Sequence, residues 1–329
     1  ISNGMKAYFL QALRGINHNK SRTLLTTLGI MIGIATVIMV FSLGEGLKSF
    51  INDQIESYGT NNIFIETVIP VSTKAREAGK SANANHLDTN QANIAVPITT
   101  LKNRDIEDIR KLPNIKTSGG AMFSQQPVTY KDVSKMIIVM GTDVARFDME
   151  STTISPGRPY TQEEENSLAQ VAILGSNVAK DFFPNIDPIG KLIRMGNYNF
   201  EVIGVYEEKG GLGAGDDDQI FIPLRTLQKK FLGVDYVNYI IVQLIDGTKA
   251  DITALDIKDV LRRNHQINDP SKDDFSVQTQ AQTMDTFNTI LNAVTFLLIA
   301  IALISLIVGG VGVMNIMYVN VTETIGEIG

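Results

Sequence analysis

Two long stretches of the sequence contain no charged residue, and they constrain the fold of this chain more than any other feature. The chain has 29 Lys and Arg and 35 Asp and Glu residues, and all of them lie outside the windows Leu24–Gly44 and Thr286–Thr322. A helix rises about 1.5 Å per residue, and the hydrocarbon core of a bilayer is about 30 Å thick. Each window is long enough to cross a membrane, so we expect two transmembrane helices.

The charges beside the first window indicate how the chain is oriented. Lys6, Arg14, Lys20 and Arg22 precede this window, and no acidic residue accompanies them. Basic residues favour the cytoplasmic side of a membrane. We therefore expect both ends of this chain on the cytoplasmic side of the cell (inner) membrane and residues 44–285 outside. The alternative is a cleaved signal peptide, but the window exceeds a signal-peptide core and lacks a small-residue cleavage site after it.

The same pattern divides the chain into segments. Residues 1–23 place apolar side chains on one helical stripe, which predicts an amphipathic helix in the cytoplasmic interface or, alternatively, a helix packed on another membrane helix. We expect the first transmembrane helix over 24–43 and an extracytoplasmic domain with stalks over 44–285. The second stalk end and transmembrane helix follow over 286–318, and a cytoplasmic coupling segment starts over 319–329.

Both membrane helices are predicted to continue into the aqueous domain as stalks. Apolar residues keep helical spacing after the first window and before the second. The stalk positions are Leu47, Phe50, Ile51, Met284, Phe287 and Leu291. A continuous helix transmits displacement where a loop absorbs it, so such stalks would couple the membrane to the outer domain. The alternative is that these are ordinary helix ends packed under a domain.

Small residues in both windows favour close approach of neighbouring helices. The first window contains a small-xxx-small step, and the second contains three closely spaced glycines and an Asn that we expect to face a partner helix. The predicted packing residues are Gly29, Gly33, Gly309, Gly310, Gly312 and Asn315.

The outer domain carries no recognisable catalytic motif. Its acids outnumber its bases, which argues against nucleic acid as a partner, and the absence of Cys removes thiolate sites. Ala78–Ser81 imitates the end of a P-loop but lacks the earlier glycine, and Gly210–Gly215 lacks the spacing of a dinucleotide site. The three histidines, His18, His86 and His265, are isolated in sequence. We therefore expect a non-enzyme with no cofactor and no metal site.

Hydrophobic patterns in the outer domain alternate between strand and helix periods, which predicts an α+β fold. Strands are expected at 63–69, 136–140, 171–174, 200–206, 220–222 and 237–244. Helices are expected at 101–112, with Thr99 or Thr100 as N-cap and Pro113 as the stop, and at 177–183, 224–231 and 251–263. The polar stretch 71–96 is expected to be a mobile excursion.

Several motifs resemble those of one transporter family. Gly309–Met317, with Val319–Glu323 and Glu327–Gly329 after it, closely resembles the helix-to-coupling-segment signature of MacB-like ABC transporter permeases, the macrolide exporter and lipoprotein-release family. Further similar motifs are Asn19–Ile30, Ser155–Tyr160, Asp187–Lys191 and Phe200–Val205. Together these motifs span most of the chain.

The resemblance implies a permease for export of a drug, peptide, lipid or lipoprotein, with an outer domain that works in mechanotransmission. Its implied partners are a separate ABC ATPase, a second permease copy in a homodimer, an optional membrane-fusion adaptor and membrane lipid. The outer domain would have a porter-like part interrupted by an inserted subdomain at about 152–235. The ATPase-coupling residues would be Val321, Thr322, Glu323 and Glu327.

Two departures from the family pattern occur at the C-terminal end. The family continues into two more membrane helices, so the resemblance implies truncation after the second. Thr324 and Gly326 stand where family members usually carry basic residues, which weakens the expected ATPase docking. The alternative function is a two-pass sensor or cell-wall hydrolase regulator with an extracytoplasmic ligand-binding domain. The coupling signature, in place of a long charged signalling helix, favours the permease.

Overall fold

The computed structural model describes residues 20–57, 61–68, 99–149, 153–184, 186–209 and 215–328. Three predicted features lie wholly or mostly outside these ranges: the interfacial helix before Lys20, the polar excursion at 71–96 and the glycine-rich segment 210–215. The chain divides into two compact units, one formed by Ile1–Asn52 with Met284–Gly329 and the other by Asp53–Thr283.

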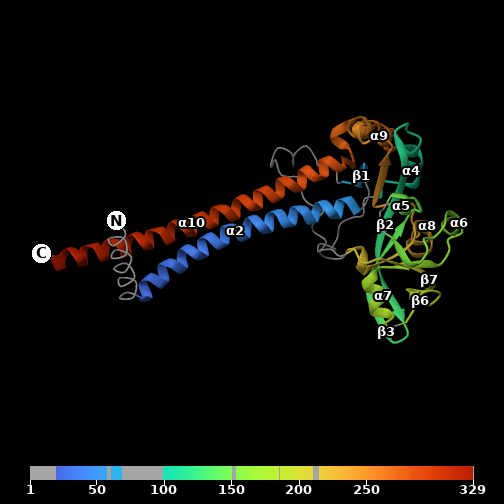
Figure 1. The fold of residues 1–329 in the computed structure, drawn as a ribbon. Coiled ribbons are helices and arrows are strands. Elements are labelled where there is room, and N and C mark those ends of the chain that lie inside the picture. The colour runs from blue at the N-terminus through green and yellow to red at the C-terminus, as the bar shows by residue number, and fades with distance from the viewer. Residues whose placement is uncertain are drawn as a thin grey trace. The chain divides into compact units, whose positions relative to one another are not determined.

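Two long helices make up the described part of the first unit. They are α2 (Lys20–Ser57) and α10 (Gln280–Ile328), coloured blue and orange to red in Figure 1. Both are long and apolar enough to cross a membrane, over Met31–Ile51 in α2 and Gln280–Met314 in α10. Each remains one helix beyond the end of its uncharged window.

The second unit is built on one mixed sheet of ten strands. The strands are β1 (Asn62–Thr67), β2 (Ile115–Tyr130), β3 (Val133–Thr142), β4 (Ile154–Gly157), β5 (Val171–Leu174), β6 (Leu192–Met195), β7 (Tyr198–Tyr206), β8 (Gln219–Pro223), β9 (Tyr239–Leu244) and β10 (Phe275–Thr279). Their order is β10-β1-β9-β2-β3-β8-β5-β7-β4, and β6 pairs with β2 and β7. The pairs β3–β8 and β5–β7 are parallel, and the others are antiparallel.

Helices cover this sheet and complete its core. They are α4 (Asn103–Arg110), α5 (Ala145–Met149), α6 (Gln162–Asn166), α7 (Ser176–Phe182), α8 (Leu224–Thr226) and α9 (Ala250–His265), with short turns η1 (Asp216–Asp218), η3 (Gly247–Lys249) and η4 (Pro270–Lys272) and the π-helical η2 (Leu227–Leu232). Ile106 of α4 and Ile257 and Leu261 of α9 share one buried cluster with Ile63 of β1 and Val242 of β9. The outer domain is therefore α+β, as its alternating patterns predict.

The segment predicted to form an inserted subdomain occupies one end of the strand order. β8, β5, β7, β4 and β6 all come from residues 152–235, and the parallel β3–β8 pair and the antiparallel β2–β6 pair join them to the remaining strands. Because the hydrogen-bonded sheet is continuous at these pairs, the described strands contain no gap that marks a subdomain boundary, and 152–235 stays a prediction.

The six predicted strands are confirmed with small shifts at their ends, whereas the N-cap prediction for the first helix of the domain is wrong. α4 begins after Lys102, not after Thr99 or Thr100, because the Lys102 N–H donates to the carboxylate of Asp105 at 2.8 Å. The predicted helix 101–112 also ends earlier, at Arg110.

The longest strand, β2, is absent from the sequence-based prediction. Its glycines and Pro127 resemble turn signals. In the structure Gly120 lies inside the strand because α4 packs directly on it: a Cβ at this position would be 2.6 Å from Ile106 Cδ1 and 2.9 Å from Val237 Cγ1. Close helix-to-sheet packing, not a turn, explains this glycine.

Candidate functional site: the junction between the sheet and the long helices

Both long helices connect to neighbouring strands at one edge of the sheet. β10 is the edge strand, β1 lies beside it, and their antiparallel register places Ile63 opposite Thr279. α2 ends shortly before β1 begins, and α10 begins at the residue that follows β10. The chain thus enters and leaves the domain through one strand pair. We call β1, β10 and the first turn of α10 (residues 280–283) the junction.

The first turn of α10 is hydrogen-bonded to the end of β10. The Gln282 N–H donates to Thr279 Oγ1 at 3.2 Å, and the Thr279 N–H donates to Gln282 Oε1 at 3.3 Å. This reciprocal pair is a capping box, which satisfies donors that a helix start otherwise leaves unpaired. The Thr283 hydroxyl also donates to the Thr279 carbonyl at 3.2 Å. The strand-to-helix connection therefore contains no free loop.

Two further bonds tie this turn to other elements of the same unit. The Asn62 N–H at the start of β1 donates to Gln280 Oε1 at 3.3 Å. Gln282 Nε2 donates to Asp251 Oδ1, in the first turn of α9, also at 3.3 Å. A displacement of residues 280–283 would therefore act on β1, β10 and α9 together.

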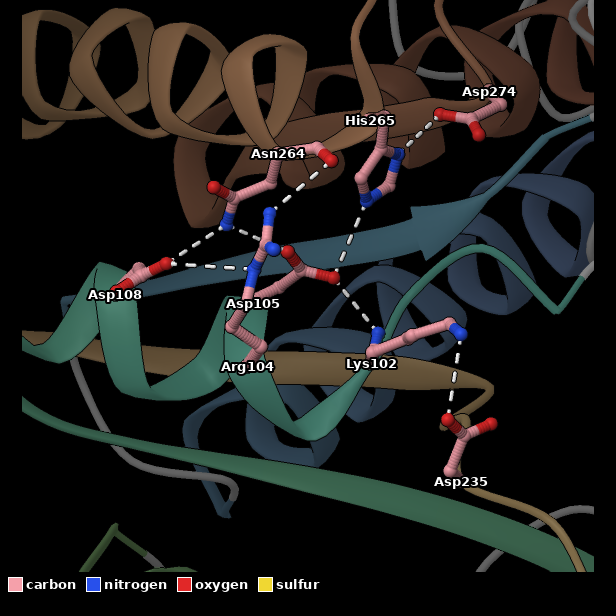
Figure 2. A network of polar contacts seen from close by, with 8 residues as sticks. All are labelled: Lys102, Arg104, Asp105, Asp108, Asp235, Asn264, His265 and Asp274. Atoms are coloured by element: carbon pink, nitrogen blue, oxygen red, sulfur yellow. Dashed lines mark hydrogen bonds and ion pairs between the residues drawn. The ribbon is translucent and has the colours of Figure 1, made fainter.

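At the opposite end of β10, His265 lies between two carboxylates (Figure 2). This residue ends α9, and its Nδ1 is 2.7 Å from Asp274 Oδ1 while its Nε2 is 3.2 Å from Asp105 Oδ2. The side chains of His265 and Asp105 are only 7% and 3% exposed. Asp274 directly precedes β10, and its carbonyl accepts a hydrogen bond from Val68 N–H after β1 at 2.9 Å. His265 thus connects α4 and α9 to the start of β10.

Other polar groups surround this histidine. Asn264 Nδ2 donates to Asp105 Oδ1 at 2.8 Å and to Asp108 Oδ2 at 3.1 Å (Figure 2). Arg104 donates to the Asn264 carbonyl at 3.2 Å. Lys102 Nζ pairs with Asp235 at 3.3 Å on the exposed rim. The Asp105 carboxylate therefore has donors from Lys102 N, Asn264 and His265.

These contacts shift the protonation of the buried groups. Burial alone would lower the pKa of His265, but hydrogen bonds to Asp105 and Asp274 and their negative charges raise it above its ordinary value. Burial would raise the pKa of Asp105, but the hydrogen bonds from His265, Lys102 N–H and Asn264 lower it. Both shifts favour an imidazolium next to two carboxylates.

Within the first unit, α2 and α10 pack against each other at two glycines. A Cβ on Gly33 would lie 3.2 Å from Leu306 Cδ1, and a Cβ on Gly44 would lie 3.2 Å from Thr295 Oγ1. The two contacts are separated by the same number of residues on both helices and occur in reversed order. α2 and α10 are therefore antiparallel neighbours in constant register.

Both helices contain a run of less exposed positions at alternating steps of three and four residues. This spacing is the seam of a coiled coil, in which side chains of one helix fill holes on the other. The seam positions are Gly33, Val37, Val40, Gly44, Leu47 and Ile51 on α2 and Met284, Asn288, Leu291, Thr295, Leu298 and Ala302 on α10.

Four of the six predicted stalk residues lie on this seam. Leu47, Ile51, Met284 and Leu291 are seam positions, and Phe287 is half-buried beside them. Phe50 is 36% exposed and lies off the seam.

The predicted membrane-packing residues lie in different environments. Gly33 is buried against α10, whereas a Cβ on Gly310 or Gly312 would meet nothing within 4 Å in the described residues. Gly309 is half-buried. Gly29 and Asn315 belong to α2 and α10, but their surroundings lie outside what the structure describes.

The predicted coupling residues lie near the end of α10. Val321 is 52% exposed, and the Thr322 hydroxyl donates to the Tyr318 carbonyl at 3.1 Å. Glu323 and Glu327 are in the same helix, and the structure does not describe their side chains. These four residues belong to the first unit, and the junction belongs to the second.

Sequence reasoning missed the junction residues Thr279 and Gln282 and the Asp105–His265–Asp274 contacts at the start of β10. The histidine contacts carry no motif, and His265 lies 160 residues after Asp105. The Thr-x-x-Gln spacing at 279–282 before an apolar run is the one local signal that was available. Among the described ranges, no group of His, Cys, Asp and Glu has the arrangement of a metal site.

The sequence matches a known protein family and several of its members. The family described as "MacB-like periplasmic core domain" matches residues 23–260. Proteins named "Macrolide export ATP-binding/permease protein MacB" are 32% identical over 320 residues in Azoarcus sp. (strain BH72) and 33% identical over 322 residues in Shewanella sp. (strain W3-18-1). These alignments cover 97% and 98% of this chain but 45% and 46% of the relatives. The chain thus spans about half the length of those proteins.

Solved structures agree on the fold. The periplasmic region of MacB from Actinobacillus actinomycetemcomitans superposes with a TM-score of 0.55 at 20% identity, covering 72% of this chain and 95% of that one. The extracellular domain of the noncanonic ABC-type transporter YknZ from Gram-positive bacteria superposes with a TM-score of 0.51 at 18% identity, covering 66% and 99%. With its family match, its α+β domain and its two apolar helices, the chain belongs to the MacB-like periplasmic core domain family.

Proposed function

We propose that this chain is the permease part of an ABC transporter that couples ATP-driven movement on the cytoplasmic side to movement of the extracytoplasmic domain. The observation that carries this proposal is α10, which is capped against β10 at Gln280 and continues as one helix to Ile328. A continuous helix passes displacement along its axis. The printed names of the relatives, which describe macrolide export, support an export role.

The proposed topology and partners follow from the same elements. Residues 44–285 lie outside the cell membrane, and both ends of this chain lie on the cytoplasmic side, supported by the bases before α2. A cytoplasmic ATPase docks near the end of α10, at Val321, Thr322, Glu323 and Glu327. Hydrolysis belongs to that ATPase, and this chain has no catalytic role. A second permease copy and, in some assemblies, a membrane-fusion adaptor complete the transporter, whose cargo is a drug, peptide, lipid or lipoprotein.

The antiparallel seam supports a mechanism in which one helix moves against the other. A shift of α10 relative to α2 would change the relative position of the β10 and β1 ends, because each strand is joined to one helix. The bond from Asn62 N–H to Gln280 Oε1 and the bonds of Gln282 would carry that shift into the sheet and α9.

A proline in α10 tests this coupling in the full-length protein assembled with its ATPase. Phe287→Pro removes a backbone hydrogen bond and kinks the helix, at a cost of about 3 kcal/mol or more. Phe287→Leu is the matched control, because it changes the same side chain and keeps the helix. We measure ATP hydrolysis and the change in hydrogen exchange of residues 275–283 when a non-hydrolysable ATP analogue binds.

The expected result is an ATP-dependent change in exchange at 275–283 in the wild type and in Phe287→Leu, and its loss in Phe287→Pro with hydrolysis retained. An unchanged ATP response in Phe287→Pro would contradict transmission through α10. The absence of any response in the wild type would contradict the coupling function itself.

A further inference from the structure

The position of His265 has a consequence for how the junction responds to pH. Its two ring nitrogens point at two different carboxylates, Asp274 at 2.7 Å and Asp105 at 3.2 Å. A carboxylate only accepts hydrogen bonds, so both contacts are favourable only when both ring nitrogens carry a proton. A neutral imidazole has one N–H, and its other nitrogen would direct a lone pair at a buried carboxylate.

We propose that His265 is a pH-responsive clamp, which as an imidazolium holds α4, α9 and the start of β10 together and on deprotonation releases the contact to α4. The direction of the release follows from the two distances. The shorter contact, to Asp274, retains the remaining proton on Nδ1, so Nε2 faces Asp105 without one. The proposal concerns the contacts of His265 with α4 and with the start of β10. Its importance for transport rests on the function proposed above.

The remaining charged groups around His265 favour this assignment. His265 is the last residue of the sixteen-residue helix α9, whose carbonyl end favours a cation. From α4, Asp105 faces both the ring and Asn264, Asp108 accepts a hydrogen bond from Asn264, and Arg104 donates to the Asn264 carbonyl (Figure 2). Lys102 contributes its backbone N–H to Asp105, while its ammonium is directed to Asp235.

The groups on the β10 side complete this environment. Asp274 supplies the second carboxylate, and the aromatic ring of Phe275 packs edge-on against the imidazole with centroids 5.7 Å apart. The neighbouring Asp273 is already engaged by Arg262, with Nη2 to Oδ2 at 2.7 Å. No basic side chain in the described residues contacts Asp274 in place of His265.

The sign of the pH effect follows from the two states of the ring. The pKa of His265 is raised on folding, so its stabilisation is complete below the unfolded value of about 6.5 and is lost as the pH rises through the folded value. The pKa of Asp105 is lowered, so its carboxylate stays charged while His265 titrates. The clamp is therefore closed in mildly acidic surroundings and opens towards alkaline pH.

Histidine NMR on the full chain in detergent micelles tests the clamp without transport or ATP. With ¹³C-labelled histidine, His18→Gln and His86→Gln identify the His265 signal while leaving His265 in place. We expect His265 to titrate above the ordinary histidine value of about 6.5, and Asp274→Asn, which removes one charge from a half-buried position, to move its midpoint down. A His265 midpoint at or below about 6.5 would overturn the proposal.

Hydrogen exchange locates the release. After correction for the intrinsic pH dependence of exchange, protection of α4 and of the start of β10 should fall between pH 6 and pH 9 in the wild type, with the larger fall in α4. In His265→Gln the protection of both segments should no longer change across this range. A wild-type protection that is independent of pH would also overturn the clamp, and neither result depends on whether the chain is a permease.

Discussion

Gly33 of α2 packs directly against Leu306 of α10. A Cβ on this glycine would lie 3.2 Å from Leu306 Cδ1 and 3.7 Å from Leu306 Cα, which is closer than most side chains tolerate. The contact lies within the apolar parts of both helices. In a lipid bilayer, close van der Waals packing at small residues is a main source of helix association. Close approach at Gly33 therefore sets the distance between the two helices.

A larger residue at Gly33 should weaken this packing. Gly33→Leu forces the helices apart, and overpacking of this kind costs about 1–3 kcal/mol. Gly46→Leu is the matched control on α2, because it gains the same helix propensity and a Cβ there meets nothing within 4 Å. We expect a lower Tm in detergent for Gly33→Leu than for Gly46→Leu. Equal Tm values would mean that Gly33 does not contact α10.

The antiparallel register predicts which cysteine pairs form a disulfide. The chain contains no Cys, so introduced pairs react without background. Gly44→Cys with Thr295→Cys should crosslink rapidly under mild oxidation, because a Cβ on Gly44 lies 3.2 Å from Thr295 Oγ1. Gly33→Cys with Thr295→Cys should not, since the sites are about 16 Å apart along the helices. The crosslinked product is measured on a gel. If Gly33→Cys with Thr295→Cys crosslinks more than Gly44→Cys with Thr295→Cys, the antiparallel register of α2 and α10 is wrong.

The proposed topology predicts different accessibility of single cysteines. Asp132→Cys, in the exposed turn between β2 and β3, should react with a membrane-impermeant maleimide in cells whose outer envelope is permeabilised. Ser2→Cys should react only after the cell membrane is lysed, because bases precede the first apolar window. Labelling of Ser2→Cys before lysis would place the N-terminal segment outside.

Glu165 of α6 should make the outer domain less stable at alkaline pH. Burial, and then the charge of the nearby Asp143, raise the pKa of Glu165 to about 7, although Val144 N–H donates to its Oε2 at 3.1 Å. The protonated form is favoured on folding, so stability is lost as the pH rises from the unfolded value of about 4.3 through the folded value.

The variant Glu165→Gln tests this expectation. The amide cannot ionise and can still accept the Val144 N–H, so the variant should be more stable than the wild type at pH 8, by up to about 3 kcal/mol, and similar at pH 5. Glu163→Gln, on the exposed face of the same helix, should change stability little at either pH. The measurement is Tm as a function of pH. If Tm changes with pH in Glu165→Gln as it does in the wild type, ionisation of Glu165 does not destabilise the folded protein.

The sequence predicts features that depend on local composition and spacing. The uncharged windows predict α2 and α10, because backbone satisfaction in hydrocarbon requires helices over such lengths. Alternating runs predict strands such as β7 and β9, because a half-buried strand exposes every second side chain. The motif resemblance at Gly309–Met317 indicates the family that the comparisons show. The domain boundaries and the coupling and stalk roles stay predictions.

Only the tertiary structure places residues that are distant in sequence next to one another. Gly120 resembles a turn residue in the sequence, but the packing of Ile106 and Val237 on β2 explains why no side chain fits there. His265 meets Asp105 because α4 and α9 pack side by side on the sheet, and their 160-residue separation leaves no local pattern that predicts the contact. The sequence by itself therefore determined the two long apolar helices and six of the ten strands. Strand register and helix packing decided the junction, because they arise from shape and hydrogen bonding between segments and not within them.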